Sequence, residues 1–221
     1  MQADMLTELA DTAGVIQVVE KGTLPDGLPY LITRPFGSLL DIDDSAELII
    51  RVVQGAASII QQLACRTPPV LHRDISVGNL IYHGDDQSPF LIDFGTAVVA
   101  PTGRFEAVNP QSITGTPTFI AQSVLQGEGY TMSSELKSLM YVFVFLVVER
   151  AAHWVNKPIG ATALAAKVAT FNDQKLFEKY VLQRCRSDFM QAVKRLRNLF
   201  WQPRHQHSVI PLQFCQALQP A

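Results

Sequence analysis

The sequence predicts an α+β fold in which a few short strands near the N-terminus lead into a mainly helical region. Residues 15–19 and 29–33 are rich in β-branched residues, and the turn-forming stretch at residues 24–27 separates them. Further along, residues 43–63 carry apolar side chains at helical spacing. We therefore expect a hairpin followed by a long helix and a helical body.

The elements can be taken in chain order. Residues 4–10 should end a first helix, which Gly14 interrupts, and the hairpin follows. The helix over residues 43–63 should begin with acidic side chains that complement its dipole, namely Asp43, Asp44 and Glu47. Its expected buried face comprises Leu48, Val52, Ala56, Ile59 and Leu63. Short strands should lie at residues 80–82 and 90–92, on either side of a solvated turn at Asp85 and Asp86. Later helices are expected at residues 133–150, 161–171, 174–185 and 187–200.

Composition limits the kinds of protein this chain can be. It has 221 residues, 48% hydrophobic and 17% charged, with a net charge of −2, which is typical of a globular domain with one core. This charge indicates no nucleic-acid partner and no anionic membrane surface. The longest apolar run, residues 139–148, is too short to span a bilayer and is expected to be a buried helix. Cys65, Cys185 and Cys215 show no metal-binding spacing, so we expect free thiols and an intracellular location, in cytoplasm or nucleus.

Two polar motifs lie on either side of the predicted strand pair. The first is His-Arg-Asp-Ile-Ser-Val-Gly-Asn at residues 72–79, and the second is Asp-Phe-Gly at residues 93–95. Asp74 would accept the proton of an attacking hydroxyl group, whereas the oxygens of Asn79 and Asp93 are ligands that Mg²⁺ prefers. Such residue types suit phosphoryl transfer, which needs mainly positioning and cations over the phosphates, and the resemblance described next implies that chemistry.

These motifs resemble the catalytic loop and the metal-binding motif of protein kinases. A third motif, Gly-Thr-Pro-Thr-Phe-Ile-Ala at residues 115–121, resembles the end of a kinase activation segment. Ser76 and the segment 134–142 resemble the fungal-type protein kinases in particular. The resemblance extends from about residue 1 to about residue 150. It implies a protein-kinase-like fold, mostly the helical large lobe with the last strands of the small lobe, together with ATP and Mg²⁺ as cofactors.

The resemblance also implies a role for each motif residue. Asp74 and Asn79 would be catalytic, and Thr116 would lie beside Asp74 and favour serine or threonine acceptors. Phe94 would pack on His72, which is expected to be a buried, hydrogen-bonded structural histidine. Asn79 and Asp93 would bind Mg²⁺. The expected ATP-binding residues are Arg34, Phe36, Ile81 and Asp93. The long activation segment favours a protein substrate over a small molecule.

Domain boundaries follow from the same resemblance. Residues 1–33 would be a remnant of the small lobe, residues 34–37 the hinge and residues 38–221 the large lobe. The Gly-rich loop, the strand lysine and the helix glutamate that precede these elements in kinases are not found in the sequence. We therefore expect a two-stranded sheet with an exposed edge, and self-association through this incomplete lobe.

Four positions modify the expected site. Ser76 replaces a lysine of many kinases, and Ser123 replaces a glutamate that forms a buried ion pair in the family. Glu135 stands where the family has an aspartate that anchors the catalytic loop. Arg73 would pair with a phosphate on the activation segment if one were added. The candidate acceptors for that phosphate are Thr102, Ser112 and Thr114.

Two alternatives remain open. The absent lysine and Gly-rich loop are also compatible with a catalytically dead pseudokinase or an interaction module, which turnover with Mg-ATP would exclude. A small-molecule kinase of the aminoglycoside or choline type could share the Asp74, Asn79 and Asp93 trio. The long activation segment argues against a small-molecule kinase. Phosphate transfer to such a small acceptor, and none to protein, would support that alternative.

Overall fold

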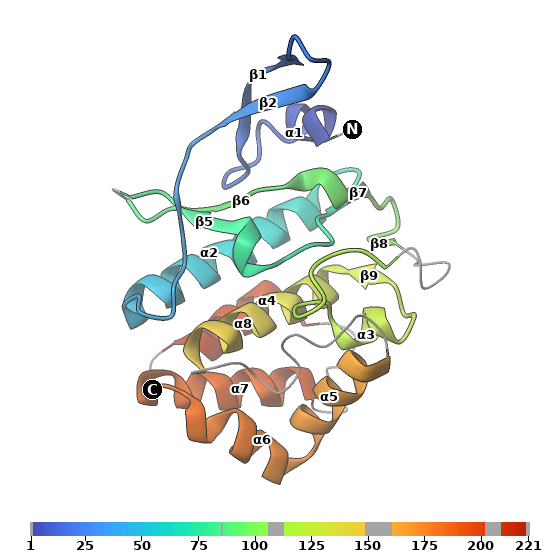
Figure 1. Ribbon diagram of the computed structural model, residues 1–221. Helices are drawn as coiled ribbons and strands as arrows, with labels where there is room; N and C mark the ends of the chain where they lie inside the picture. The colour runs from blue at the N-terminus through green and yellow to red at the C-terminus, as the bar shows by residue number, and fades with distance from the viewer. Residues whose placement is uncertain (1, 85, 106–112, 149–160, 202–208, 220–221) are drawn as a thin grey trace.

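The computed structural model describes residues 2–84, 86–105, 113–148, 161–201 and 209–219. A hairpin and a short helix lie at one end, short strands and a long helix in the middle, and the remaining helices at the other end (Figure 1). The strands are β1 (Gln17–Thr23), β2 (Pro29–Arg34), β3 (Ser38–Leu39), β4 (Val70–Leu71), β5 (Leu80–Tyr82), β6 (Pro89–Leu91), β7 (Val98–Val99), β8 (Arg104–Phe105) and β9 (Tyr130–Thr131). The helices are α1 (Gln2–Glu8), α2 (Ala46–Cys65), α3 (Gln122–Leu125), α4 (Met132–Val147), α5 (Ala161–Asn172), α6 (Gln174–Tyr180), α7 (Met190–Trp201) and α8 (Pro211–Leu218).

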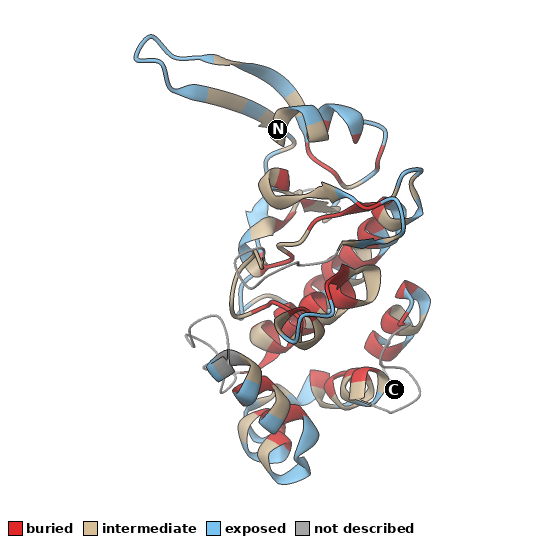
Figure 2. Cartoon of the chain, turned by 90° about the vertical axis from the view of Figure 1, so that its right-hand side faces the viewer, coloured by how far each residue is buried: buried red, intermediate tan, exposed pale blue. Residues whose placement is uncertain are grey.

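The hairpin of β1 and β2 is antiparallel and forms a two-stranded sheet, as expected. The predicted start of its first strand was wrong, because β1 begins at Gln17 and not at residue 15. Val15 and Ile16 are buried beneath the hairpin, and Val15 forms a parallel bridge to Leu91 in β6. The first apolar residues of that run therefore attach the hairpin to the body, while the hairpin itself is largely exposed (Figure 2).

Helix α2 begins three residues later than predicted. Ser45 caps it, because the Ser45 hydroxyl oxygen accepts a hydrogen bond from the Leu48 amide at 3.2 Å. Asp43 and Asp44 therefore precede the helix and do not form its first turn. The predicted buried face is confirmed at all five positions, Leu48, Val52, Ala56, Ile59 and Leu63. By length and composition α2 could cross a membrane, but half of it is buried inside the protein, as in core helices, so this is weak evidence for a span.

Helix α4 is the central helix of the body. Thr131 and Ser134 form a reciprocal capping box at its N-terminus. All of the predicted buried run, residues 139–148, is buried apart from the half-buried Phe145. The Phe143 ring packs edge-on against the Phe189 ring, with 5.5 Å between centroids.

The predicted C-terminal helices agree with the structure only in part. Helix α5 has the predicted position, but α6 ends at Tyr180 and a 3₁₀ turn over Leu182–Arg184 follows it. Helix α8 was not predicted. It packs on α2 and α7, where Phe214 and Leu218 are buried.

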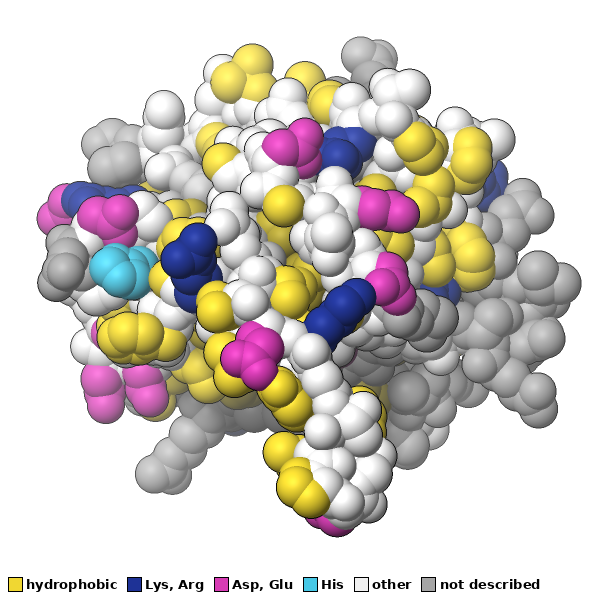
Figure 3. All heavy atoms as spheres, turned by 90° about the horizontal axis from the view of Figure 1, so that it is seen from above, with side chains coloured by type: hydrophobic (Ala, Val, Ile, Leu, Met, Phe, Trp, Pro, Cys, Tyr) yellow, Lys and Arg dark blue, Asp and Glu magenta, His cyan; other side chains and the backbone are white. Residues whose placement is uncertain are grey.

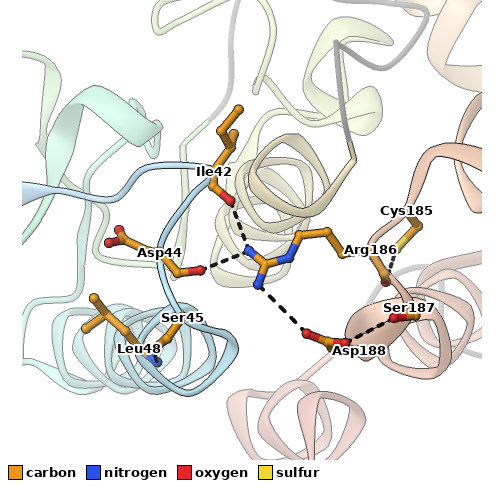
Figure 4. Close-up of polar contacts among 8 residues, drawn as sticks. All are labelled: Ile42, Asp44, Ser45, Leu48, Cys185, Arg186, Ser187 and Asp188. Carbon is orange, nitrogen blue, oxygen red and sulfur yellow. Dashed lines mark hydrogen bonds and ion pairs between the residues drawn. The ribbon is translucent and has the colours of Figure 1, made fainter.

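The Arg186 side chain links two segments that are far apart in the sequence (Figure 4). Its guanidinium donates hydrogen bonds to the carbonyl oxygens of Ile42 and Asp44, both at 2.9 Å. The same side chain approaches the carboxylate of Asp188 at 3.8 Å. The loop before α2 is thereby joined to the turn before α7.

Candidate functional site

The catalytic-loop histidine is a buried structural residue. His72 is fully buried, its Nε2 lies 3.0 Å from the carbonyl oxygen of Ile92, and its ring packs edge-on against Phe94 at 4.6 Å between centroids. The predicted packing of Phe94 on His72 is therefore confirmed. Burial lowers the pKa of His72, which favours the neutral ring.

Asp74 and Thr116 lie in direct contact. Asp74 Oδ1 accepts hydrogen bonds from the Thr116 amide at 2.7 Å and from the Thr116 hydroxyl at 2.8 Å. The preceding residue, Gly115, has φ of +106°, and an added Cβ there would lie 2.6 Å from the carbonyl oxygen of Arg73. Glycine is therefore required for the activation segment to approach the catalytic loop this closely.

Asn79 and Asp93 are brought together by the β5–β6 pair. The Asn79 carbonyl oxygen accepts a hydrogen bond from the Ile92 amide at 3.0 Å, which places Asn79 beside the residue before Asp93. The Asn79 amide nitrogen donates to the carbonyl oxygen of Asp74 at 3.0 Å, which leaves its side-chain oxygen for another partner. Asp93 has a left-handed backbone with φ of +58°, and its Oδ1 accepts from the Gly95 amide at 3.2 Å.

This donor set fits Mg²⁺. One carboxylate and one amide oxygen are hard ligands, and Mg²⁺ commonly takes few protein ligands and fills its remaining positions with water and phosphate. No cluster of three or more His, Cys, Asp or Glu side chains suited to a metal occurs in the described part of the chain. A metal there would thus be held jointly by Asn79, Asp93 and a phosphate-bearing partner.

Glu135 anchors the catalytic loop from α4. Its Oε1 accepts a hydrogen bond from the Arg73 amide at 2.7 Å, so the longer side chain reaches the position expected for the family's aspartate. Burial raises the pKa of Glu135 to about 7, although its backbone hydrogen bonds oppose the shift. Its Oε2 is buried with no hydrogen-bond partner among the described residues and lies at a cavity of about 10 Å³, close to the volume that holds one water.

The Arg73 side chain is already engaged. Its guanidinium carbon lies 4.5 Å from the Phe105 ring centroid and 5.5 Å from that of Tyr130, and its Nε donates to the Thr96 carbonyl oxygen at 2.6 Å. The Tyr130 hydroxyl in turn donates to the Thr114 carbonyl oxygen and accepts from the Thr114 amide. Of the candidate phosphate acceptors, Thr102 and Thr114 are described, whereas Ser112 lies outside the described residues.

The predicted hinge residues line a different space from the motif residues. Arg34 and Phe36 border a cleft of about 900 Å³ together with parts of α2 and the turn between β5 and β6. Ile81, Asp93 and the catalytic loop do not line this cleft. Ile81 is buried in β5, where it pairs with Leu39 and Phe90. The structure therefore brings Asp74, Asn79, Asp93 and Thr116 together, and places Arg34 and Phe36 at a separate cleft.

One residue at the site was missed in the sequence. Lys167 on α5 is fully buried, and its ammonium nitrogen donates to the carbonyl oxygens of Pro117 and Ile120 at 3.1 and 2.5 Å. No pattern in the sequence marked Lys167, because a lone lysine on a helix normally faces solvent.

The similarity to known proteins agrees with this geometry. A model of the fungal protein kinase family matches residues 28–147, which is more than half of the chain. The probable serine/threonine-protein kinase PBL5 of Arabidopsis thaliana is 33% identical over 139 residues, covering 62% of this chain and 31% of that protein. The serine/threonine-protein kinase dst3 of Dictyostelium discoideum is 27% identical over 147 residues, covering 62% of this chain and 25% of that protein. The matched regions thus span about a third or less of these relatives' length.

The fold has a counterpart among solved structures. The structure of vaccinia related kinase 3 superimposes with a TM-score of 0.71 at 15% identity, covering 98% of this chain and 70% of that one. At this identity the match establishes the protein kinase fold alone. The family match over residues 28–147 covers more than half of the chain and therefore shows the family. The chain is a member of the fungal protein kinase family.

Proposed function

We propose that this chain transfers the γ-phosphoryl group of Mg-ATP to a serine or threonine hydroxyl of a protein. The observation that carries the proposal is the contact of Thr116 with Asp74 Oδ1, through both amide and hydroxyl. This contact holds the carboxylate in one orientation at the end of the activation segment. Asp74 would accept the proton of the substrate hydroxyl, whose oxygen bonds to the γ-phosphorus as the bond to ADP breaks.

The neighbouring residues would position the nucleotide. Asn79 and Asp93 would hold Mg²⁺, which neutralises phosphate charge when it is bound. The adenine would lie against the hinge segment with Arg34, Phe36 and Ile81. The position of Ile81 beside Leu39, the first strand after the hinge, supports its part in this assignment. The side chains of Arg34 and Phe36 border the separate cleft described above, so their part in the assignment rests on the resemblance of residues 34–37 to a kinase hinge.

The first test is binding of Mg-ATP to the 221-residue chain, measured by thermal shift. We expect Mg-ATP to raise the melting temperature of the wild-type chain and of a control variant, Asp26→Ala, in the hairpin turn. Asp93→Ala should abolish the rise, because it removes a carboxylate that holds the metal. Equal shifts in all three proteins would show that Asp93 does not hold the metal.

The second test is phosphoryl transfer to serine, threonine and tyrosine peptides. We expect transfer to serine and threonine, and a loss of about 10²-fold or more in Asp74→Asn with nucleotide binding retained. Wild-type turnover in both Asp74→Asn and Asp93→Ala would contradict the site assignment. Transfer only to a small-molecule acceptor would contradict the protein substrate.

A non-catalytic role as a pseudokinase or interaction module is the second candidate. It is favoured by the position of Lys21, the lysine of the hairpin, whose ammonium nitrogen lies 3.1 Å from Asp4 Oδ1 and so is engaged away from Asp93. The same two tests decide between the candidates. Binding of Mg-ATP without transfer to any acceptor would favour the non-catalytic role.

The hairpin and the cysteines support two further expectations. The apolar side chains of Val19, Leu24, Leu28 and Ile32 are exposed on the hairpin, and Figure 3 shows apolar side chains along it when that end is viewed from above. Self-association through this surface is therefore expected, and sedimentation would detect it as a concentration-dependent mass. The three cysteines are unpaired, which supports an intracellular location.

A further inference from the structure

A fully buried lysine lies beneath the activation segment. Lys167 projects from α5, which packs beside α3 at the end of that segment (Figure 1). Its ammonium nitrogen also lies 4.6 Å from the centroid of the Tyr141 ring on α4. Burying an ammonium group is costly unless it gains compensating hydrogen bonds, so such a residue needs a structural or functional reason.

The lysine's hydrogen-bond partners lie at both ends of one short turn. Lys167 donates to the carbonyl oxygens of Pro117 and Ile120. Within the turn, the amides of Phe119 and Ile120 donate to the carbonyl oxygen of Thr116 at 2.9 and 3.2 Å. The turn therefore closes on Thr116, and the ammonium group holds it from the side of α5.

The turn connects Lys167 to Asp74. Thr116 is the residue whose amide and hydroxyl donate to Asp74 Oδ1. The chain of contacts thus runs from the Lys167 ammonium through the turn to Thr116 and then to the Asp74 carboxylate. Among the described residues, Thr116 alone donates hydrogen bonds to the Asp74 carboxylate. The position of Thr116 therefore sets the orientation of that carboxylate.

We propose that Lys167 is a positioning residue, which holds the turn of residues 117–120 so that Thr116 orients Asp74. The proposal deepens the proposed function and rests on it for its catalytic meaning. The tether itself is a property of the fold and can be tested without any activity. Ser123, which replaces a glutamate of the resembled family, is not among the hydrogen-bond acceptors of Lys167 in the described structure.

The charge of Lys167 is part of the tether. Burial, and secondarily the charge of Lys137 on α4, lowers the pKa of Lys167 to about 7. Lys137 lies over the Trp201 ring of α7 at 4.0 Å and is influenced by Glu128. No carboxylate pairs with Lys167 within the described ranges, so carbonyl oxygens and the Tyr141 ring are what stabilise its charge there.

The test is amide hydrogen exchange in two lysine variants and their wild type. In Lys167→Met, which keeps an unbranched side chain one atom shorter but removes its donors, we expect the amides of Thr116, Phe119 and Ile120 to exchange about tenfold faster or more. Amides of α2 should stay within about twofold of wild type. Lys167→Arg should restore part of the protection, because it keeps charge and donors.

Lys137→Met is the matched control, since Lys137 is half-buried and rests on an aromatic ring but forms no hydrogen bond with the turn among the described residues. It should leave the three amides within about twofold of wild type. The proposal is overturned if Lys167→Met also leaves them within that range, or if it speeds exchange in α2 and the turn alike.

If Lys167→Met fails to fold, the wild-type chain provides the test. Protection of the Thr116, Phe119 and Ile120 amides, corrected for intrinsic exchange, should fall between pH 6 and pH 8 as Lys167 loses its proton, while protection in α2 stays constant. Unchanged protection of the turn would overturn the proposal. A chain that shows the exchange effects but transfers no phosphate would retain the tether and refute the proposed function, so the two failures are distinguishable.

Where activity is measurable, the variants give a further readout. Lys167→Met should lower kcat more than it raises KM for ATP. Its pH profile should also lack the decline near pH 7 to 8 that we expect in the wild type as Lys167 loses its proton. Lys167→Arg should recover part of kcat. A purely structural lysine would lower the amount of folded enzyme and leave the shape of the pH profile unchanged.

Discussion

The β1–β2 hairpin and helix α4 contain similar apolar side chains but bury them to very different degrees. Val19 and Ile32 in the hairpin are 56% and 48% exposed, whereas Leu139 and Phe143 in α4 are fully buried. The partners in the described hydrogen bonds of Asp74 lie in the catalytic loop and the activation segment, and α4 anchors that loop through Glu135. The comparison teaches that the geometry of the motif residues depends on the helical body and not on the hairpin.

The largest expected difference between the two regions concerns stability. Phe143→Ala should lower the free energy of unfolding by about 3–5 kcal/mol, because it leaves a cavity against Phe189 in a closely packed core. The matched variant is Phe36→Ala, the same substitution at a side chain that is 88% exposed beside the hairpin. It should change the free energy of unfolding by less than about 0.5 kcal/mol.

Urea denaturation monitored by circular dichroism measures both variants. Similar losses in Phe143→Ala and Phe36→Ala would contradict the comparison, since they would mean that the hinge segment contributes as much packing as the central helix.

The second prediction concerns Glu135 and pH. The pKa of Glu135 is about 7 in the folded chain, whereas an ordinary glutamate has a pKa of 4.5. The folded state therefore binds one more proton than the unfolded state between these two pH values. Raising the pH from about 4.5 to about 7 should therefore lower stability, by at most about 1.4 kcal/mol per pH unit from this group. Above pH 7 the carboxylate is ionised in both states, and its contribution becomes constant.

Glu135→Gln isolates this effect. The variant keeps an oxygen to accept from the Arg73 amide but cannot titrate, so the wild type should lose stability relative to it between pH 5 and pH 7. Denaturation curves of both proteins across this range measure the difference, in which the contributions of other titrating groups cancel. Parallel curves would show that Glu135 does not hold a proton in the folded state.

The smallest expected effect lies in the hairpin. Lys21→Met removes the pair of Lys21 with Asp4, whose side chains are both mostly exposed. Exposed pairs contribute little, so the melting temperature should change by no more than about 1 °C. A larger fall would show that the hairpin and α1 are coupled to the body more strongly than their burial indicates.

Local patterns in the sequence predicted much of the structure. The spacing of apolar residues predicted the buried face of α2, and the motif order predicted that Phe94 would pack on His72 and that Thr116 would lie beside Asp74. Each of these depends on a periodicity or on a motif with a known arrangement.

Features that depend on contacts between distant segments were not predictable in this way. Val15 looked like part of a strand but is drawn into the body by its bridge to Leu91. Lys167 lies far along the chain from Pro117 and Ile120, and no local pattern marks a lysine whose partners are backbone carbonyls. The start of α2 was missed because the Ser45 cap competes with three nearby acidic residues that all favour a helix N-terminus.

The close approach at Gly115 means that one small substitution could displace the motif residues of this chain. A methyl group there would strike the Arg73 carbonyl and would also demand a backbone angle that only glycine adopts readily. Gly115→Ala would thus change no charge and remove no hydrogen-bonding group, yet it would force the segment that carries Thr116 away from Asp74. Such a change would alter the geometry of the site alone, because every reactive group would remain present but displaced.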